Sequence, residues 1–167
     1  MNSDRPLLPG WAVPSGSQSG ERSLSFFVPG KPETAGSKKM GFKREGSEVI
    51  GRVIIDDNPK GRGWKRAVAA HAMRQVGRPM LKGPVSMRLW FILQRPLAHF
   101  VGRKRENALR ADAPGWPAVK PDTLKLARAV EDGLTGVLYV DDAQIVVQVH
   151  SKQYGPEPGV HVEVIAL

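Results

Sequence analysis

Residues 120–145 read KPDTLKLARAVEDGLTGVLYVDDAQI, and the rest of the chain can be interpreted outward from them. The first half predicts a helix of about 13 residues. Asp122 follows a proline at a favourable N-cap position, where its carboxylate can accept a backbone N–H of the first turn. Gly136 predicts the end of this helix. Apolar residues at helical spacing predict its buried face: Leu124, Ala127, Val130 and Leu134, with Leu126 and Val137 widening the stripe.

The second half of the stretch reverses the chain and ends in two acids, Asp141 and Asp142. A few extended residues after Gly136, at about 3.3 Å each, span roughly 20 Å, which matches the length of the helix. The sequence therefore predicts an extended return that brings Asp142 beside Asp122. Two such carboxylates suit Mg²⁺, which takes one or two protein carboxylates and keeps several waters. The alternative is a capping Asp122 and a simple Asp141–Asp142 turn, and spacing alone favours that alternative.

The composition predicts one domain with a real core and a basic surface. The chain has 167 residues, 41% of them hydrophobic, and a net charge of +9. It has no cysteine, which excludes disulfides and thiolate metal sites. No run approaches the roughly 18 apolar residues of a membrane span, and the N-terminus lacks a signal pattern, so we expect a cytoplasmic protein.

The charge is unevenly distributed along the chain. Residues 31–110 hold 19 Lys and Arg against 6 Asp and Glu (+13), whereas residues 111–167 hold 4 against 8 (−4). A basic body with a small acidic cluster is typical of proteins that bind nucleic-acid phosphates and act on one of them. The alternative is a basic protein with no nucleic-acid role.

Elsewhere the pattern predicts an α+β fold: a single domain over residues 23–167 with a mixed β-sheet and two helices, after a disordered tail over residues 1–22. The predicted helices span residues 63–76 and 122–134. Strands are predicted at residues 23–28, 49–55, 84–94, 143–150 and 160–165. The third has two apolar rows, which predicts a central strand covered on both faces. The last two are predicted to pair as an antiparallel hairpin.

Two basic segments are candidates for DNA contact. Residues 31–48 are rich in Gly and Lys and are interpreted either as a solvated loop or as a hairpin arm with Phe42 available for stacking. Residues 95–119 form a long polar connection, which in a small domain is usually functional or disordered. The predicted DNA-contacting residues are Lys38, Lys39, Lys43, Arg44, Lys65, Arg103, Lys104, Arg105 and Lys125.

KPD before a helix, followed by LTGVLYVDDAQIV, resembles the RusA family of Holliday junction resolvases, which is common in bacteriophages and prophages. FFVPGKP, WKRAVAAHA and GPVSMRLWFILQRP fit the same pattern, so the resemblance covers roughly residues 23–165. It implies a homodimeric, Mg²⁺-dependent endonuclease (Mn²⁺ is a possible substitute) that cuts four-way junctions and other branched DNA in recombination and repair.

The resemblance also implies roles for particular residues. The family's first metal-site aspartate falls on Asp122, the last of its DD pair falls on Asp142 with Asp141 beside it, and its helical basic residue, typically Lys, falls on Arg128. The family usually has Asp-x-Asp before the helix, but here Leu124 occupies the second position. One carboxylate fewer weakens metal binding. The alternative hypothesis is therefore a branched-DNA-binding relative with weak or no activity. Arg128 could instead pair with Asp132 on the helix surface.

Overall fold

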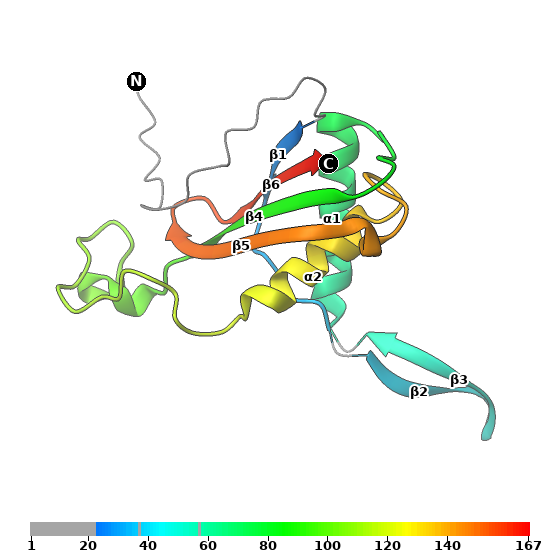
Figure 1. Cartoon of the computed structure of the whole chain (residues 1–167). Helices are drawn as coiled ribbons and strands as arrows, with labels where there is room; N and C mark the ends of the chain where they lie inside the picture. The colour runs from blue at the N-terminus through cyan, green and yellow to red at the C-terminus, as the bar shows by residue number, and fades with distance from the viewer. Residues whose placement is uncertain (1–22, 37, 57) are drawn as a thin grey trace.

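The computed structural model describes residues 23–36, 38–56 and 58–167. A four-stranded mixed sheet carries two helices, and a two-stranded ribbon projects from this body (Figure 1). The predicted α+β class is confirmed, whereas the predicted tail over residues 1–22 lies outside the described residues. The main elements are β1 (Ser23–Pro29), β2 (Lys38–Glu45), β3 (Glu48–Asp56), α1 (Pro59–Val76), β4 (Val85–Gln94), α2 (Thr123–Leu134), β5 (Ile145–Gly155) and β6 (Gly159–Ala166).

The main sheet has the strand order β1-β6-β4-β5. β4 pairs antiparallel with β6 and parallel with β5. The predicted β5–β6 hairpin is therefore wrong, because β4 lies between the two strands. β4 is the most apolar strand, and a central position with a partner on each side buries it best. Parallel neighbours need a crossover connection, and α2 provides it.

The two faces of β4 differ in their cover. The row that faces the helices is fully buried: Val85, Met87, Leu89 and Phe91. In the opposite row Trp90 is 36% exposed, and Arg88 forms an ion pair with Glu163 of β6 at 3.1 Å. The prediction that β4 is covered on both faces is therefore wrong. The helices α1 and α2 lie on one face, and the other face is open to solvent.

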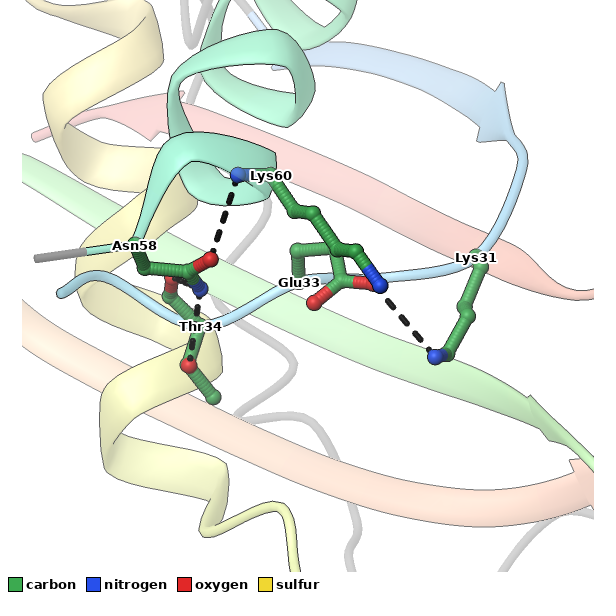
Figure 2. A network of polar contacts seen from close by, with 5 residues as sticks. All are labelled: Lys31, Glu33, Thr34, Asn58 and Lys60. Carbon is green, nitrogen blue, oxygen red and sulfur yellow. Dashed lines mark hydrogen bonds and ion pairs between the residues drawn. The ribbon is translucent and has the colours of Figure 1, made fainter.

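α1 begins at Pro59, four residues before the predicted start at residue 63. Asn58 caps it, since its side-chain oxygen accepts the N–H of Lys60 at 3.2 Å. Its side-chain nitrogen donates to the carbonyl of Thr34 at 3.0 Å, which joins the segment after β1 to the helix start (Figure 2). A Lys31–Glu33 ion pair at 3.4 Å lies in the same segment. Proline suits the first helical position because its fixed φ is already helical.

The buried face of α2 agrees with the predicted apolar stripe except at Leu124. Its buried face comprises Leu126, Ala127, Ala129, Val130, Gly133 and Leu134. Leu124, predicted to face the core, is 66% exposed, so that prediction is wrong. The close approach of α1 sets the rotation: a Cβ on Gly133 would lie 2.9 Å from the Lys65 carbonyl oxygen.

The basic segment at residues 31–48 contains a strand, so the hairpin-arm interpretation is confirmed. β2 and β3 pair antiparallel as a ribbon that extends from the body (Figure 1). Met40 and Phe42 on β2 are 65% and 55% exposed. The long connection after β4 contains two short 3₁₀ turns and an isolated bridge between Phe100 and Leu109.

The close contact at Gly133 predicts that a Gly→Ala change there and one at Gly63 alter the free energy of unfolding in opposite directions. Gly133→Ala should lower the free energy of unfolding by about 1–2 kcal/mol, because crowding against α1 outweighs the gain in helix propensity. Gly63→Ala in α1, where a Cβ meets open space, should raise it by up to about 1 kcal/mol. Urea denaturation of the two variants measures both effects. Equal stabilisation would contradict this account of α2.

Candidate active site

Asp122 lies at the N-terminal end of α2 and is the N-cap residue, as predicted. Its carboxylate makes no capping bond to the helix, so that part of the prediction is wrong. The side chain is 60% exposed, and the ammonium of Lys125 lies 3.9 Å from it. The carboxylate is therefore accessible to a ligand.

Lys152 of β5 holds the chain just before Asp122. Its ammonium donates to the carbonyl oxygens of Val119 at 2.6 Å and Pro121 at 2.8 Å. Sequence analysis missed this residue because it is 31 positions from Pro121 and lies between the strands predicted at residues 143–150 and 160–165. The basic end of α2 is defined here as Lys120, Lys125, Arg128 and Lys152.

Asp141 and Asp142 lie at the other end of α2. The chain turns tightly after the helix, where the Gly136 N–H donates to the Tyr139 carbonyl at 2.7 Å. Asp142 then opens a 3₁₀ turn that Asp141 caps by accepting the Ala143 N–H at 2.8 Å. The predicted extended return is therefore wrong. The acidic end, defined here as Asp132, Asp141 and Asp142, lines an open hollow of about 350 Å³ together with Thr135.

Topology keeps Asp122 and Asp142 apart within one chain. Asp122 precedes the crossover helix, whereas Asp142 follows it and precedes β5, so they lie at opposite ends of the unit (Figure 1). Twelve residues of α2 at about 1.5 Å each separate the ends by roughly 18 Å. Within the described part of the chain, no group of three or more His, Cys, Asp or Glu could hold a metal ion. The predicted approach of Asp142 to Asp122 is therefore not seen within one chain.

Gln144 fixes the position of the two acids, and sequence analysis missed its role. Its side-chain oxygen accepts the N–H groups of Val140 at 2.8 Å and Asp141 at 3.1 Å. Its side-chain nitrogen donates to the carbonyls of Leu81 at 3.0 Å and Gly83 at 2.8 Å. One glutamine thus joins the acidic turn to the segment before β4. Its place after Asp-Asp-Ala is the only sequence signal of this role.

Tyr139 is fully buried below the acidic turn, and its hydroxyl donates to the Glu131 carbonyl at 3.1 Å. Burial, and then the negative charges of Glu131 and Asp142, raise the pKa of Tyr139 far above its ordinary value. The phenol therefore stays protonated and anchors the turn to the last turn of α2.

The remaining helix residues divide into an exposed and a paired group. Arg128 is exposed, as contact with a phosphate requires. Asp132 pairs with Lys65 of α1 at 2.6 Å. That pair joins the helices, which favours a structural role for Lys65 over the predicted DNA contact. The Asp132 carboxylate, which was the alternative surface partner predicted for Arg128, is therefore engaged by Lys65.

The other predicted DNA-contacting residues lie in two exposed regions. Lys43 and Arg44 are exposed on the ribbon, and Arg103, Lys104 and Arg105 are exposed in the long connection. The side chains of Lys38 and Lys39 lie outside what the structure describes. The ribbon and the long connection project from opposite sides of the body, with α2 between them (Figure 1).

Comparison with known proteins identifies the family. The model of the family "Endodeoxyribonuclease RusA" matches residues 29–165, which include both ends of α2. The chain belongs to the RusA family. It is also 31% identical over 140 residues to "Uncharacterized protein YqaN" of Bacillus subtilis (strain 168). The aligned residues cover 83% of this chain and 93% of that protein. In the part of this chain that the structure describes, no helix is long and apolar enough to cross a membrane.

The hydrogen bonds of Gln144 predict a stability effect. Gln144→Leu should lower the free energy of unfolding by about 1–3 kcal/mol, because two N–H groups and two carbonyls lose their partner. Gln153→Leu on the exposed side of β5 is the matched control and should stay within about 0.5 kcal/mol. Thermal denaturation compares the two, and a similar effect of both would contradict the anchoring role.

Tyr139 predicts a loss of stability at alkaline pH. Below the ordinary tyrosine pKa of about 10 the phenol is protonated in both the folded and the unfolded chain. Above it the unfolded chain ionises while the folded chain does not, so the free energy of unfolding falls by up to about 1.4 kcal/mol per pH unit. Tyr139→Phe should flatten this fall in urea denaturation between pH 9 and 11. The same fall in the unmodified protein and in the variant would contradict the role given to this phenol.

Proposed function

We propose that this protein is a structure-specific endodeoxyribonuclease that resolves Holliday junctions and related branched DNA. The observation that carries the proposal is the match to the RusA endodeoxyribonuclease family across residues 29–165. The exposed acids at the two ends of α2 and the basic segments on either side of that helix are consistent with cleavage of a phosphodiester in DNA.

The proposed catalytic residues are Asp122, Asp141, Asp142 and Arg128. Asp122 and Asp142 are the proposed ligands of a divalent cation, Mg²⁺ or Mn²⁺, because carboxylate oxygens are the donors that such ions prefer. A bound cation supplies an activated water and neutralises charge on the phosphate. Arg128 is permanently protonated, so it can hold a phosphate through two hydrogen bonds but cannot accept a proton.

DNA binding is proposed to depend on the two basic projections. Lys43 and Arg44 on the ribbon and Arg103, Lys104 and Arg105 in the long connection can contact phosphates on different arms of a branched substrate. Their separation across the body suits a junction better than a single duplex (Figure 1). We also propose that the protein is a homodimer that acts in the cytoplasm.

The catalytic proposal predicts the behaviour of single variants on a synthetic four-way junction. With Mg²⁺, the unmodified protein should cut the junction, and Asp122→Asn and Asp142→Asn should each lower the rate by about 100-fold or more, as loss of a group that acts on the reacting water would. Glu157→Gln is the control, since this exposed acid lies between β5 and β6, outside the proposed catalytic and DNA-contacting groups, and should leave cleavage unchanged. Equal cleavage by all variants would refute the assigned roles.

The second candidate is a branched-DNA-binding protein without cleavage. Two features favour it: Leu124 stands where the resemblance implies an aspartate, and α2 separates the remaining acids within one chain. In that case the junction would be retarded in gels, with affinity falling steeply as salt rises, and no cut would appear with Mg²⁺ or Mn²⁺. Leu124→Asp tests whether the site has lost a ligand. If the variant gains cleavage, the site is degraded at Leu124; if it changes nothing, the site takes its metal ligands from other residues.

A further inference from the structure

The ribbon formed by β2 and β3 carries large apolar side chains that remain exposed in the described structure (Figure 1). We propose that this ribbon is a base-stacking arm. Phe42, with Met40 beside it, stacks on a base at the branch point of a DNA junction, while neighbouring cations hold the flanking phosphates. The inference deepens the function proposed above, and its choice of branched DNA as the ligand rests on that function.

Apolar residues gather along both strands of the ribbon. Met40 and Phe42 on β2 are 65% and 55% exposed, and Val49, Ile50 and Val53 on β3 are 47%, 48% and 40% exposed. The core formed by the described side chains includes none from either strand. A two-stranded ribbon without a core has only marginal stability of its own. Exposed apolar side chains that cluster in this way mark a surface that binds a partner.

The strand register places Phe42 beside a cation. Phe42 of β2 lies directly opposite Arg52 of β3, so their side chains share one face of the ribbon. Met40 precedes Phe42 by two residues and therefore lies on that same face. Both Phe42 and Arg52 are exposed. This face thus presents an aromatic ring on which a base can stack, with a guanidinium close enough to bind the adjacent phosphate.

The charges around Phe42 favour nucleic acid as the partner of this face. Lys43 and Arg44 follow Phe42 on β2, Arg52 lies opposite it on β3, and all three cations are exposed. In the part of the chain that the structure describes, none of the three has an ion-pair partner. The two acids among the described side chains of the ribbon lie beyond them at its tip. An aromatic ring among unpaired cations matches a base between two phosphates, whereas an apolar protein contact does not need these cations.

A branch point offers a base to such an arm at the lowest free-energy cost. Inserting an apolar side chain into an intact duplex separates stacked bases, which costs free energy at each step. The cost is least for bases whose pairing or stacking is already interrupted, as it is where the strands of a junction exchange. The arm therefore favours branched DNA over plain duplex, a preference that contacts to phosphates alone do not provide.

The root of the arm is bonded to the starts of both helices. The Ala35 N–H donates to the carbonyl of Lys125, in the first turn of α2, at 2.9 Å. The side chain of Asn58, which caps α1, also binds the carbonyl of Thr34 (Figure 2). These contacts hold the root at the basic end of α2. Phe42 is seven residues beyond Ala35, so its ring lies at most about 25 Å from the root.

Junction binding by the full chain, measured without divalent cations so that no DNA is cut, tests the arm. The probe is a synthetic four-way junction with 2-aminopurine at the branch point, whose fluorescence rises when this base leaves its stack. The unmodified protein should produce that rise on binding. Phe42→Ala should abolish it and weaken the affinity by about 5- to 100-fold, the range expected for one base stacked on an aromatic ring. Phe42→Trp, which restores a ring, should recover the affinity to within about 3-fold of the unmodified protein.

Matched controls separate stacking from charge and from damage to the ribbon. Val53 lies opposite Gly41, the neighbour of Phe42, so Val53→Ala truncates an exposed apolar side chain on the other face and should change the affinity by less than about 2-fold. Arg44→Ala should reduce the slope of log affinity against log salt by about 1, whereas Phe42→Ala should leave that slope unchanged. A reporter about 12 base pairs from the branch point, roughly 40 Å away, lies beyond the arm and should show no rise.

Cleavage of the same junction with Mg²⁺, measured in parallel, separates the arm from the nuclease function. If the unmodified protein does not cut the junction but Phe42→Ala loses affinity and the fluorescence rise, the nuclease function fails and the stacking arm stands. If the protein cuts the junction and Phe42→Ala binds with unchanged affinity and fluorescence, the arm is overturned, its apolar face serves a protein contact, and the nuclease function stands. Equal losses in Phe42→Ala and Val53→Ala, or no fluorescence rise with the unmodified protein, also overturn the arm.

Discussion

The parallel pairing of β4 with β5 is the constraint on which the rest of this structure depends. Parallel neighbours can be joined only by a chain that returns to the starting end of the sheet, and α2 makes this return. The residue before such a helix and the residue before the second strand must lie at opposite ends of the unit. The separation of Asp122 from Asp142 therefore follows from the topology.

Each end of the crossover is held by one polar side chain from elsewhere in the fold. Lys152 binds two carbonyls before Asp122, and Gln144 binds four backbone groups around the acidic turn. Such contacts satisfy backbone groups that are left unpaired outside helices and strands. They also hold exposed carboxylates in place without using the carboxylates themselves. Both ends of α2 are thus positioned rigidly while their acids remain accessible.

The fold places the charged segments of the sequence in separate regions of the molecule. The basic ribbon and the basic connection project from different sides, and α2 lies between them (Figure 1). Within that helix the charges are again divided, with cations near the N-terminus and carboxylates near the C-terminus. The proposed junction binding thus depends on the two basic projections, whereas the proposed chemistry depends on the acids at the ends of α2.

Local pattern by itself determined both helices, five of the six strands, the N-cap position of Asp122, the glycine that follows α2 and the family, because periodicity and motifs are properties of neighbouring residues. Only the tertiary structure decided that β4 separates β5 from β6, that Leu124 faces solvent and that the two acidic sites lie at opposite ends of α2. These features depend on which distant surfaces bury each other: the apolar β4 takes the centre of the sheet, and the contact at Gly133 sets the rotation of α2. No spacing along the chain records such contacts.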